Sequence, residues 1–275
     1  MTSSINTNVG AMIALQNLNA TSSQLNSVQN IISTGLKVSS AKDNGAVYAI
    51  AQNQRADVSA LDSVTDSLNR NASVVDVAMS AGDSITDLLT QMKAKALAAS
   101  DTSLDTTSRD AMQTDFNSLR DQITSTLSNA SFNGIDILDG STTKLTALTN
   151  ASGTGHLTVQ GQNLSLGGSI VTVGTTASFS TATSASTLLS SIDTSINNVS
   201  AALAKLGTSS SALTNQITFV GKLQDSINQG IGNLVDADMA TESSRLQALQ
   251  TKQQLGVQAL SIANQSTSTV LSLFR

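Results

Sequence analysis

Residues 189–234 read LSSIDTSINNVSAALAKLGTSSSALTNQITFVGKLQDSINQGIGNL, with apolar side chains at alternating intervals of three and four residues. Twelve of the fourteen positions in this series are apolar, whereas the hydrophobic share of the whole chain is 39%. The series comprises Leu189, Ile192, Ile196, Val199, Leu203, Leu206, Ser210, Leu213, Ile217, Val220, Gln224, Ile227, Ile231 and Leu234. This spacing places one apolar stripe along a helix, and a stripe of this length is typical of a coiled coil. We predict that the stripe forms core contacts within the chain.

Two further stretches have the same spacing. One runs from Val58 to Leu89, and a helix from Val47 to Ala99 around it would be roughly 80 Å long at about 1.5 Å per residue. The other comprises Met112, Phe116, Leu119, Ile123 and Leu127. A helix of the first length cannot lie within a compact globule of 275 residues. We therefore expect a mainly α fold, a long antiparallel coiled-coil or helical-bundle rod.

The two ends of the chain are almost free of charge. Residues 1–36 contain no charged side chain, and none lies between Lys252 and Arg275. Both stretches have helical apolar spacing, which predicts that an N-terminal and a C-terminal helix pair. Burying Asn or Ser is less unfavourable than burying an unpaired charge, so these helices suit insertion among many neighbours. We predict that they form contacts between subunits through Ala11, Leu15, Leu18, Leu25, Ile32, Leu36, Leu246, Leu249, Leu260, Ala263, Val270, Leu271 and Phe274.

Breaks in these patterns indicate the domain organisation. Gly35 ends the first helix, and Phe132-Asn133-Gly134 is a turn signal. A Ser-, Thr- and Gly-rich segment follows, in which alternating residues at 156–160 and 170–173 predict one or two β-hairpins. We expect a terminal coiled-coil domain (1–42 plus 235–275), a helical rod domain (43–140 plus 184–234) and a short β-rich insertion (141–183).

Composition excludes several classes of function. The chain has no Cys and a single His, His156, which excludes thiolate chemistry and the usual histidine-dependent catalytic or metal sites. A net charge of −5 and an aromatic content of 2% argue against nucleic-acid binding. The sequence has neither the apolar run of a membrane span nor the features of a cleavable signal peptide. We expect a protein that is not an enzyme and has no cofactor, metal, nucleic acid or membrane as a partner.

Two polar features have ordinary structural explanations. Asp236, Asp238 and Glu242 could suggest a cation site, but acidic residues at the start of a helix more commonly interact with its dipole. His156 lies in the insertion, where we expect it to be solvated.

Several motifs at both ends of the chain resemble those of bacterial flagellins. The stretch 33–44 (STGLKVSSAKDN) is similar to their "SGLRINSAADDAA", and the last six residues are similar to their "VLSLLR" ending. Further similarities occur at INTN (5–8), ALQNLN (14–19), FNG (132–134), DADMATES (236–243) and ANQ (263–265). The resemblance covers residues 1–140 and 188–275 in the same order, whereas the short middle does not match.

The resemblance implies a structural subunit that polymerises into the extracellular flagellar filament used for swimming. Flagellins are exported unfolded by the flagellar type III apparatus, and their terminal helices, disordered in the monomer, form the inner core of the filament. The implied partners are other copies of the chain, other flagellins, the export apparatus and its chaperone, the filament cap and hook-associated proteins. O-glycosylation of the insertion is a further expectation from the family.

One family site is altered in this sequence. The innate immune flagellin receptor of animals recognises a helix that reads "LQRVRELAVQ" in many flagellins, and residues 89–97 match it as LTQMKAKAL. Gln91 stands in place of a key Arg, and Lys95 in place of a Leu. Losing a cation and exchanging an apolar side chain for a charge should both weaken that contact. We therefore predict weak receptor activation.

Two alternative functions remain at this point. A hook–filament junction protein shares the terminal helices but does not form long filaments. A secreted coiled-coil translocator is a more distant alternative, which liposome leakage without filament formation would support.

Overall fold

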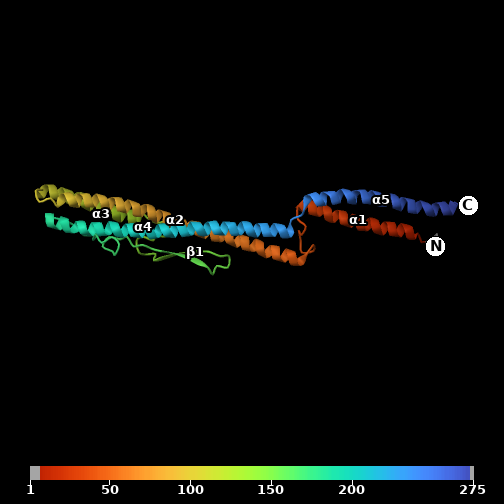
Figure 1. The fold of residues 1–275 in the computed structure, drawn as a ribbon, viewed down its shortest axis with the longest axis horizontal. Coiled ribbons are helices and arrows are strands. Elements are labelled where there is room, and N and C mark those ends of the chain that lie inside the picture. Colours follow the sequence, from red (N-terminus) through yellow and green to blue (C-terminus); the bar gives the residue numbers. More distant parts are fainter. Residues whose placement is uncertain (1–6, 273–275) are drawn as a thin grey trace. The chain divides into compact units, whose positions relative to one another are not determined.

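The computed structural model describes the backbone of residues 7–272 and the side chains of residues 7–265. This part of the chain contains five helices and one antiparallel two-stranded sheet (Figure 1). The elements are α1 (Val9–Thr34), α2 (Gly45–Ala99), α3 (Thr106–Ser128), β1 (Lys144–Leu148), β2 (His156–Gln160), α4 (Ala182–Val235) and α5 (Met239–Ser272). The predicted mainly α fold, with paired terminal helices and a small mid-chain hairpin, is confirmed.

The chain forms two compact units. One contains both terminal segments, up to residue 56 and from residue 226 onward, and the other contains residues 57–225. The boundaries lie within α2 and α4, so each of these helices contributes to both units. Among the residues that the structure describes, no helix is long and apolar enough to cross a membrane.

Helices α2 and α4 pack side by side in opposite directions in the unit of residues 57–225 (Figure 1). The predicted stripe on α4 is confirmed, because each of its fourteen positions is buried or half-buried. The deepest positions recur every seven residues, at Ile192, Val199, Leu206, Leu213 and Val220. On α2 the residues Leu61, Leu68, Val75 and Leu89 are buried, and with Gly82 they recur every seven residues. The heptad spacing of both helices is that of knobs-into-holes packing.

Two close contacts link these helices. The Lys93 ammonium lies 2.6 Å from an Asp193 carboxylate oxygen, linking α2 to α4. At Gly82, an added Cβ atom would lie 2.5 Å from Cδ2 of Leu203. The missing side chain therefore allows the helices to approach closely, and a larger residue would force Leu203 to move.

Helix α3 returns along α2 after a tight loop. Arg109 on α3 is buried, and its guanidinium donates to the carbonyls of Ala99, Asp101 and Leu104 at 3.0–3.2 Å. These acceptors belong to the end of α2 and the following loop, where free carbonyls carry partial negative charge. Arg109 therefore closes the α2–α3 turn.

The insertion contains one hairpin. Strands β1 and β2 pair antiparallel from Lys144–Gln160 to Leu148–His156, with His156 exposed. The run 170–173 is not a strand: Val171 and Val173 are buried, but the N–H of Thr172 donates to Ser195 Oγ on α4 at 2.9 Å. The alternation therefore reflects a loop that packs on a helix, with α4 side chains supplying the hydrogen bonds that a partner strand would supply.

Candidate assembly interface

The N-terminal helix begins and ends with well-formed caps. The Asn8 side-chain oxygen accepts from the Ala11 N–H at 3.0 Å, while its amide nitrogen donates to the carbonyl of Ala263 at 2.8 Å. One residue thus caps α1 and ties it to α5. At the other end Gly35 adopts φ 70°, and its N–H donates to the Ile31 carbonyl at 2.8 Å. Glycine adopts this left-handed conformation without steric cost, as predicted for the end of this helix.

Backbone hydrogen bonds join the segment after α1 to the α4–α5 junction. The Lys37 N–H donates to the Val235 carbonyl at 2.7 Å, and the Ala237 N–H donates to the Gly35 carbonyl at 2.9 Å. The carboxylate of Asp238 then caps α5, accepting from the N–H groups of Ala240 and Thr241 at 3.0 and 3.2 Å. A hydrogen bond from the Thr241 hydroxyl and those backbone bonds lower the pKa of Asp238. Asp238 thus acts as a helix cap.

The acidic residues at this junction have separate surroundings. Asp236 is exposed, and a Glu242 carboxylate oxygen lies 3.7 Å from the Arg245 guanidinium. Within the described part of the chain, no group of three or more His, Cys, Asp or Glu residues is arranged to hold a metal ion.

Helices α1 and α5 pack antiparallel along one apolar seam (Figure 1). Leu25, Val28 and Leu249 are buried in it, with Ile32 and Leu246 packed against them. Further along the pair, Gly256 allows the Leu18 side chain to lie against the α5 backbone. The seam of α1 follows two heptads, 11-18-25-32 and 14-21-28, all of whose residues are buried or half-buried.

The residues that we predicted as subunit contacts divide into three groups. Nine of them are covered within one chain. Leu25 and Leu249 are buried, and the half-buried residues are Ala11, Leu18, Ile32, Leu36, Leu246, Leu260 and Ala263. Leu15 is not covered, because it is 47% exposed. The side chains of Val270 and Leu271 and the whole of Phe274 lie outside the described residues.

Two buried residues of the seam were missed in the sequence. Thr21 and Val28 are 3% and 1% exposed, and the Thr21 hydroxyl donates to the Asn17 carbonyl at 2.8 Å. Their heptad spacing from Ala14 is the signal that could have found them. Because Leu15 is more apolar than Ala14, the predicted stripe passed through Leu15, one residue away from the position that packs on α5.

Apolar side chains outside the seam remain exposed on each helix, and we refer to these two exposed surfaces together as the open apolar face. It comprises Val9, Met12, Ile13 and Leu15 on α1 and Leu255, Val257 and Ile262 on α5, which are 47% to 68% exposed. The residues of α1 line a shallow groove of about 610 Å³ together with Thr7, Gln16 and Asn19. These side chains are apolar or neutral, so the groove can accept another apolar helix without desolvating a charge.

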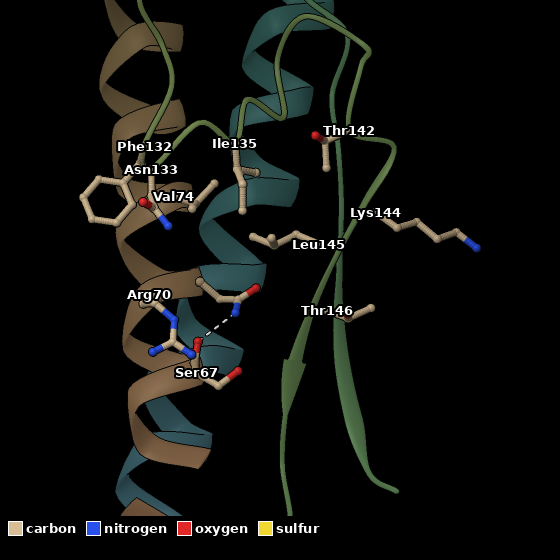
Figure 2. A pocket seen from close by; sticks show the side chains of 11 residues that line it. Ser67, Arg70, Val74, Phe132, Asn133, Ile135, Thr142, Lys144, Leu145 and Thr146 are labelled. Atoms are coloured by element: carbon tan, nitrogen blue, oxygen red, sulfur yellow. Dashed lines mark hydrogen bonds between the residues drawn. The ribbon is translucent and has the colours of Figure 1, made fainter. Parts of the chain in front are cut away.

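A cleft of about 390 Å³ lies in the other unit, between α2, the turn at residues 132–135 and the hairpin (Figure 2). Phe132 and Ile135 exchange two backbone hydrogen bonds of 3.0 Å, and both turn residues, Asn133 and Gly134, have positive φ. This is the Asn-Gly hairpin turn that the sequence indicates. Inside the cleft, Asn71 donates to the Ser67 carbonyl at 2.7 Å, and its buried side-chain oxygen has no partner.

The cleft has no catalytic arrangement. Its eleven lining residues include Arg70 and Lys144 but no carboxylate, imidazole or thiol. Acid–base or nucleophilic chemistry needs such a group near a nucleophile. The cleft can hold water or a polar side chain, which would satisfy the oxygen of Asn71.

The altered receptor residues lie on α2. Gln91 is exposed, and the Lys95 ammonium lies 2.6 Å from an Asp115 carboxylate oxygen on α3. The ion pair directs the Lys95 side chain toward α3.

Comparisons with known proteins agree with this arrangement. Residues 5–143 match the bacterial flagellin N-terminal helical region, and residues 189–274 match the bacterial flagellin C-terminal helical region. The chain is 60% identical to "Flagellin FljO" of Caulobacter vibrioides over 272 residues, covering 99% of this chain and 98% of that protein. It is 40% identical to a flagellin of Brucella melitensis, with 99% of each chain covered.

The fold also matches a solved structure. The structure described as a putative flagellar hook-associated protein from Vibrio parahaemolyticus has a TM-score of 0.55 and 19% identity, covering 70% of this chain and all of that one. At this identity the match shows the shared fold alone. The two family regions and the full-length similarity to named flagellins are more specific: this chain belongs to the bacterial flagellins, the non-enzymatic structural subunits that polymerise into the flagellar filament.

Proposed function

We propose that the open apolar face of α1 and α5 is the surface through which copies of this flagellin pack in the filament. The observation that carries the proposal is the pair of faces on α1. One face packs on α5 in the same chain, while Met12, Ile13 and Leu15 remain exposed beside it. An exposed apolar strip on a helix that is already packed indicates an interaction with a partner.

Neighbouring copies of the same chain are suitable partners for this face. The strip on α1 of one copy can cover the exposed apolar residues on α5 of the next, and such a contact between two different surfaces grows into a filament when the rotation does not close. Apart from Lys252, the exposed polar residues around the strip are Asn, Gln, Ser and Thr, which can exchange water for hydrogen bonds when buried.

The terminal segments 1–42 and 235–275 would then form the inner core of the filament. Segments 43–140 and 184–234 would form the helical rod domain, and residues 141–183 the short insertion. We infer that the terminal helices are disordered in the free monomer. The part of α5 beyond Lys252 has no charge pairs to stabilise it as an isolated helix.

Membership of the family also supports a route of assembly. We infer export by the flagellar type III apparatus with a chaperone, and extracellular assembly beneath a cap, next to hook-associated proteins. Pull-down of the chain with purified candidate partners tests each of these interactions.

Deletion of residues 1–36 tests the assembly surface. The truncated protein should retain the folded unit of residues 57–225, seen as a cooperative loss of helical circular dichroism on heating, but should form no filaments by electron microscopy. Stable filaments from the truncated protein would contradict the proposal. Full-length protein that binds filament ends without elongating them would indicate a junction protein instead.

A further inference from the structure

We propose that neighbouring copies also meet through two oppositely charged stripes, an acidic stripe on α2 and a basic stripe on α4. The acidic stripe consists of Asp62, Asp66, Asp76, Asp83 and Asp87, and the basic stripe of Lys205 and Lys222 with Phe219 between them. The occupant of each stripe is a second copy of this chain. This inference rests on the proposed function and adds a charged side contact to the apolar one.

The acidic stripe has no counter-charge within the chain. All five carboxylates are exposed, and none forms an ion pair in the described part of the chain. Asp62 and Asp66 are four residues apart, as are Asp83 and Asp87, so each pair repels along the helix. This repulsion disfavours the isolated helix, and a cationic partner would remove it.

Nearby cations do not neutralise this stripe. Arg70 is the single basic residue of α2 between Asp57 and Lys93, and it lines the cleft beside the hairpin (Figure 2). Lys93 and Lys95 are held by Asp193 and Asp115. The stripe therefore presents net negative charge.

The exposed face of α4 has the complementary charge. No carboxylate occurs between Asp193 and Asp225, and both lysines in this interval are exposed. Neither lysine forms an ion pair with any residue that the structure describes. Phe219 is 57% exposed beside Lys222, which gives the stripe an apolar contact as well.

The spacing of the charges matches between the two stripes. Lys205 and Lys222 are seventeen residues apart, and so are Asp66 and Asp83. Each interval spans about 25 Å of helix at roughly 1.5 Å per residue. When α2 of one copy lies along α4 of another, the axial spacing of the two lysines therefore equals that of the two carboxylates.

Charge also determines the symmetry of this contact. A two-fold contact of α2 with α2 would place carboxylates opposite carboxylates. A contact of α2 with α4 joins two different surfaces and leaves each copy with its other stripe free. Such a contact is heterologous and can repeat from copy to copy, as a filament requires.

Charge reversal tests the proposal better than removal does, because single exposed ion pairs contribute little. The double variant Lys205→Glu and Lys222→Glu places like charges opposite one another. We expect its critical concentration for seeded polymerisation to rise at least about tenfold at low NaCl. The quadruple variant, which adds Asp66→Lys and Asp83→Lys, should restore polymerisation to within about threefold of the unmodified chain, because its stripes are again complementary.

The control is Lys42→Glu with Lys144→Glu, which makes the same change in net charge at two exposed lysines outside both stripes. Its critical concentration should match that of the unmodified chain. Thermal unfolding followed by circular dichroism should show equal helix content in all four proteins.

The outcomes separate this inference from the proposed function. The charged contact would be overturned if the double variant polymerised as well as the control, or if a folded quadruple variant did not regain polymerisation. Filaments of the unmodified chain would still support the apolar contact in either case. An unmodified chain that never polymerised would overturn both.

Discussion

Replacing Ile262 by Ser should weaken assembly without destabilising the folded chain. Ile262 is 68% exposed on α5, and it is the most exposed residue of the open apolar face. Complete burial of an isoleucine side chain contributes about 1.5–3 kcal/mol, and roughly two-thirds of this side chain is still accessible for burial. Docking of a neighbour should therefore gain about 1–2 kcal/mol from this residue. Since about 1.4 kcal/mol is a tenfold change in an equilibrium constant, the critical concentration should rise roughly 5- to 30-fold.

Two other substitutions make this measurement specific. Ile50→Ser removes an equally large side chain, 49% exposed on α2, from outside the open face and should change the critical concentration less than about threefold. Leu249→Ala empties the buried seam between α1 and α5 and should destabilise the pair by about 2–5 kcal/mol in the filament, where assembly has ordered both helices.

The assay is sedimentation of seeded polymer at a series of monomer concentrations, with circular dichroism of the monomer. Equal critical concentrations for Ile262→Ser and Ile50→Ser would refute the assignment of the open face. A loss of monomer helix in Ile262→Ser would also refute it, because the side chain would then belong to the folded core.

Three further predictions concern other sites. Arg109→Ala should lower the free energy of unfolding by about 2–4 kcal/mol in urea titrations, since three carbonyls lose a charged donor; an unchanged midpoint would contradict this role. The folded-state pKa of Asp238 is lowered, so its contribution to stability should be present above the unfolded value near 3.8 and be lost as the pH falls through the folded value. Asp238→Asn should therefore reduce the acid sensitivity of stability below that pH, as measured by unfolding of assembled filaments, in which α5 is ordered, at successive pH values. Gln91→Arg with Lys95→Leu should raise receptor activation in a reporter-cell assay, and unchanged potency would show that these positions do not limit recognition.

The long helices could be predicted because their stripes are long and regular. From Ile192 to Val220 an apolar residue of α4 returns every seven positions, and each of them is buried. A repeat sustained over so many turns has one consistent register. The Asn133-Gly134 turn was equally predictable, because few residues adopt positive φ easily.

The register of α1 could not be predicted in the same way. Both Ala14 and Leu15 continue a three-four pattern from Ala11, and Leu15 is the more apolar of the two. Packing on α5 covers Ala14 and leaves Leu15 exposed, because the heptad through Thr21 and Val28 faces the partner. A helix with two apolar faces can pack on its own chain with one face and on another molecule with the other. Hydrophobicity alone does not show which face does which.

Arg109 and the run 170–173 were missed for another reason. Arg109 acts through backbone carbonyls, which leave no residue pattern in the sequence. The alternation at 170–173 is that of a strand, yet Thr172 bonds to Ser195 across 23 residues. Both depend on which segments meet in the folded chain.

The distribution of charge along the chain agrees with two kinds of contact between copies. Burying an unpaired charge in a fully buried interface is strongly unfavourable. A contact that stays solvated tolerates charge, and the charges then determine which surfaces pair. The terminal helices, up to residue 36 and beyond Lys252, lack charge and carry the open apolar face. Charge is found instead on the exposed faces of α2 and α4, where the acidic stripe and the basic stripe occupy different helices. Between copies, a contact of terminal helices that excludes water would supply most of the binding energy. A solvated contact between α2 and α4 would determine which surfaces meet. High NaCl should then impair the second contact more than the first, and this difference separates the two contributions in one set of polymerisation curves.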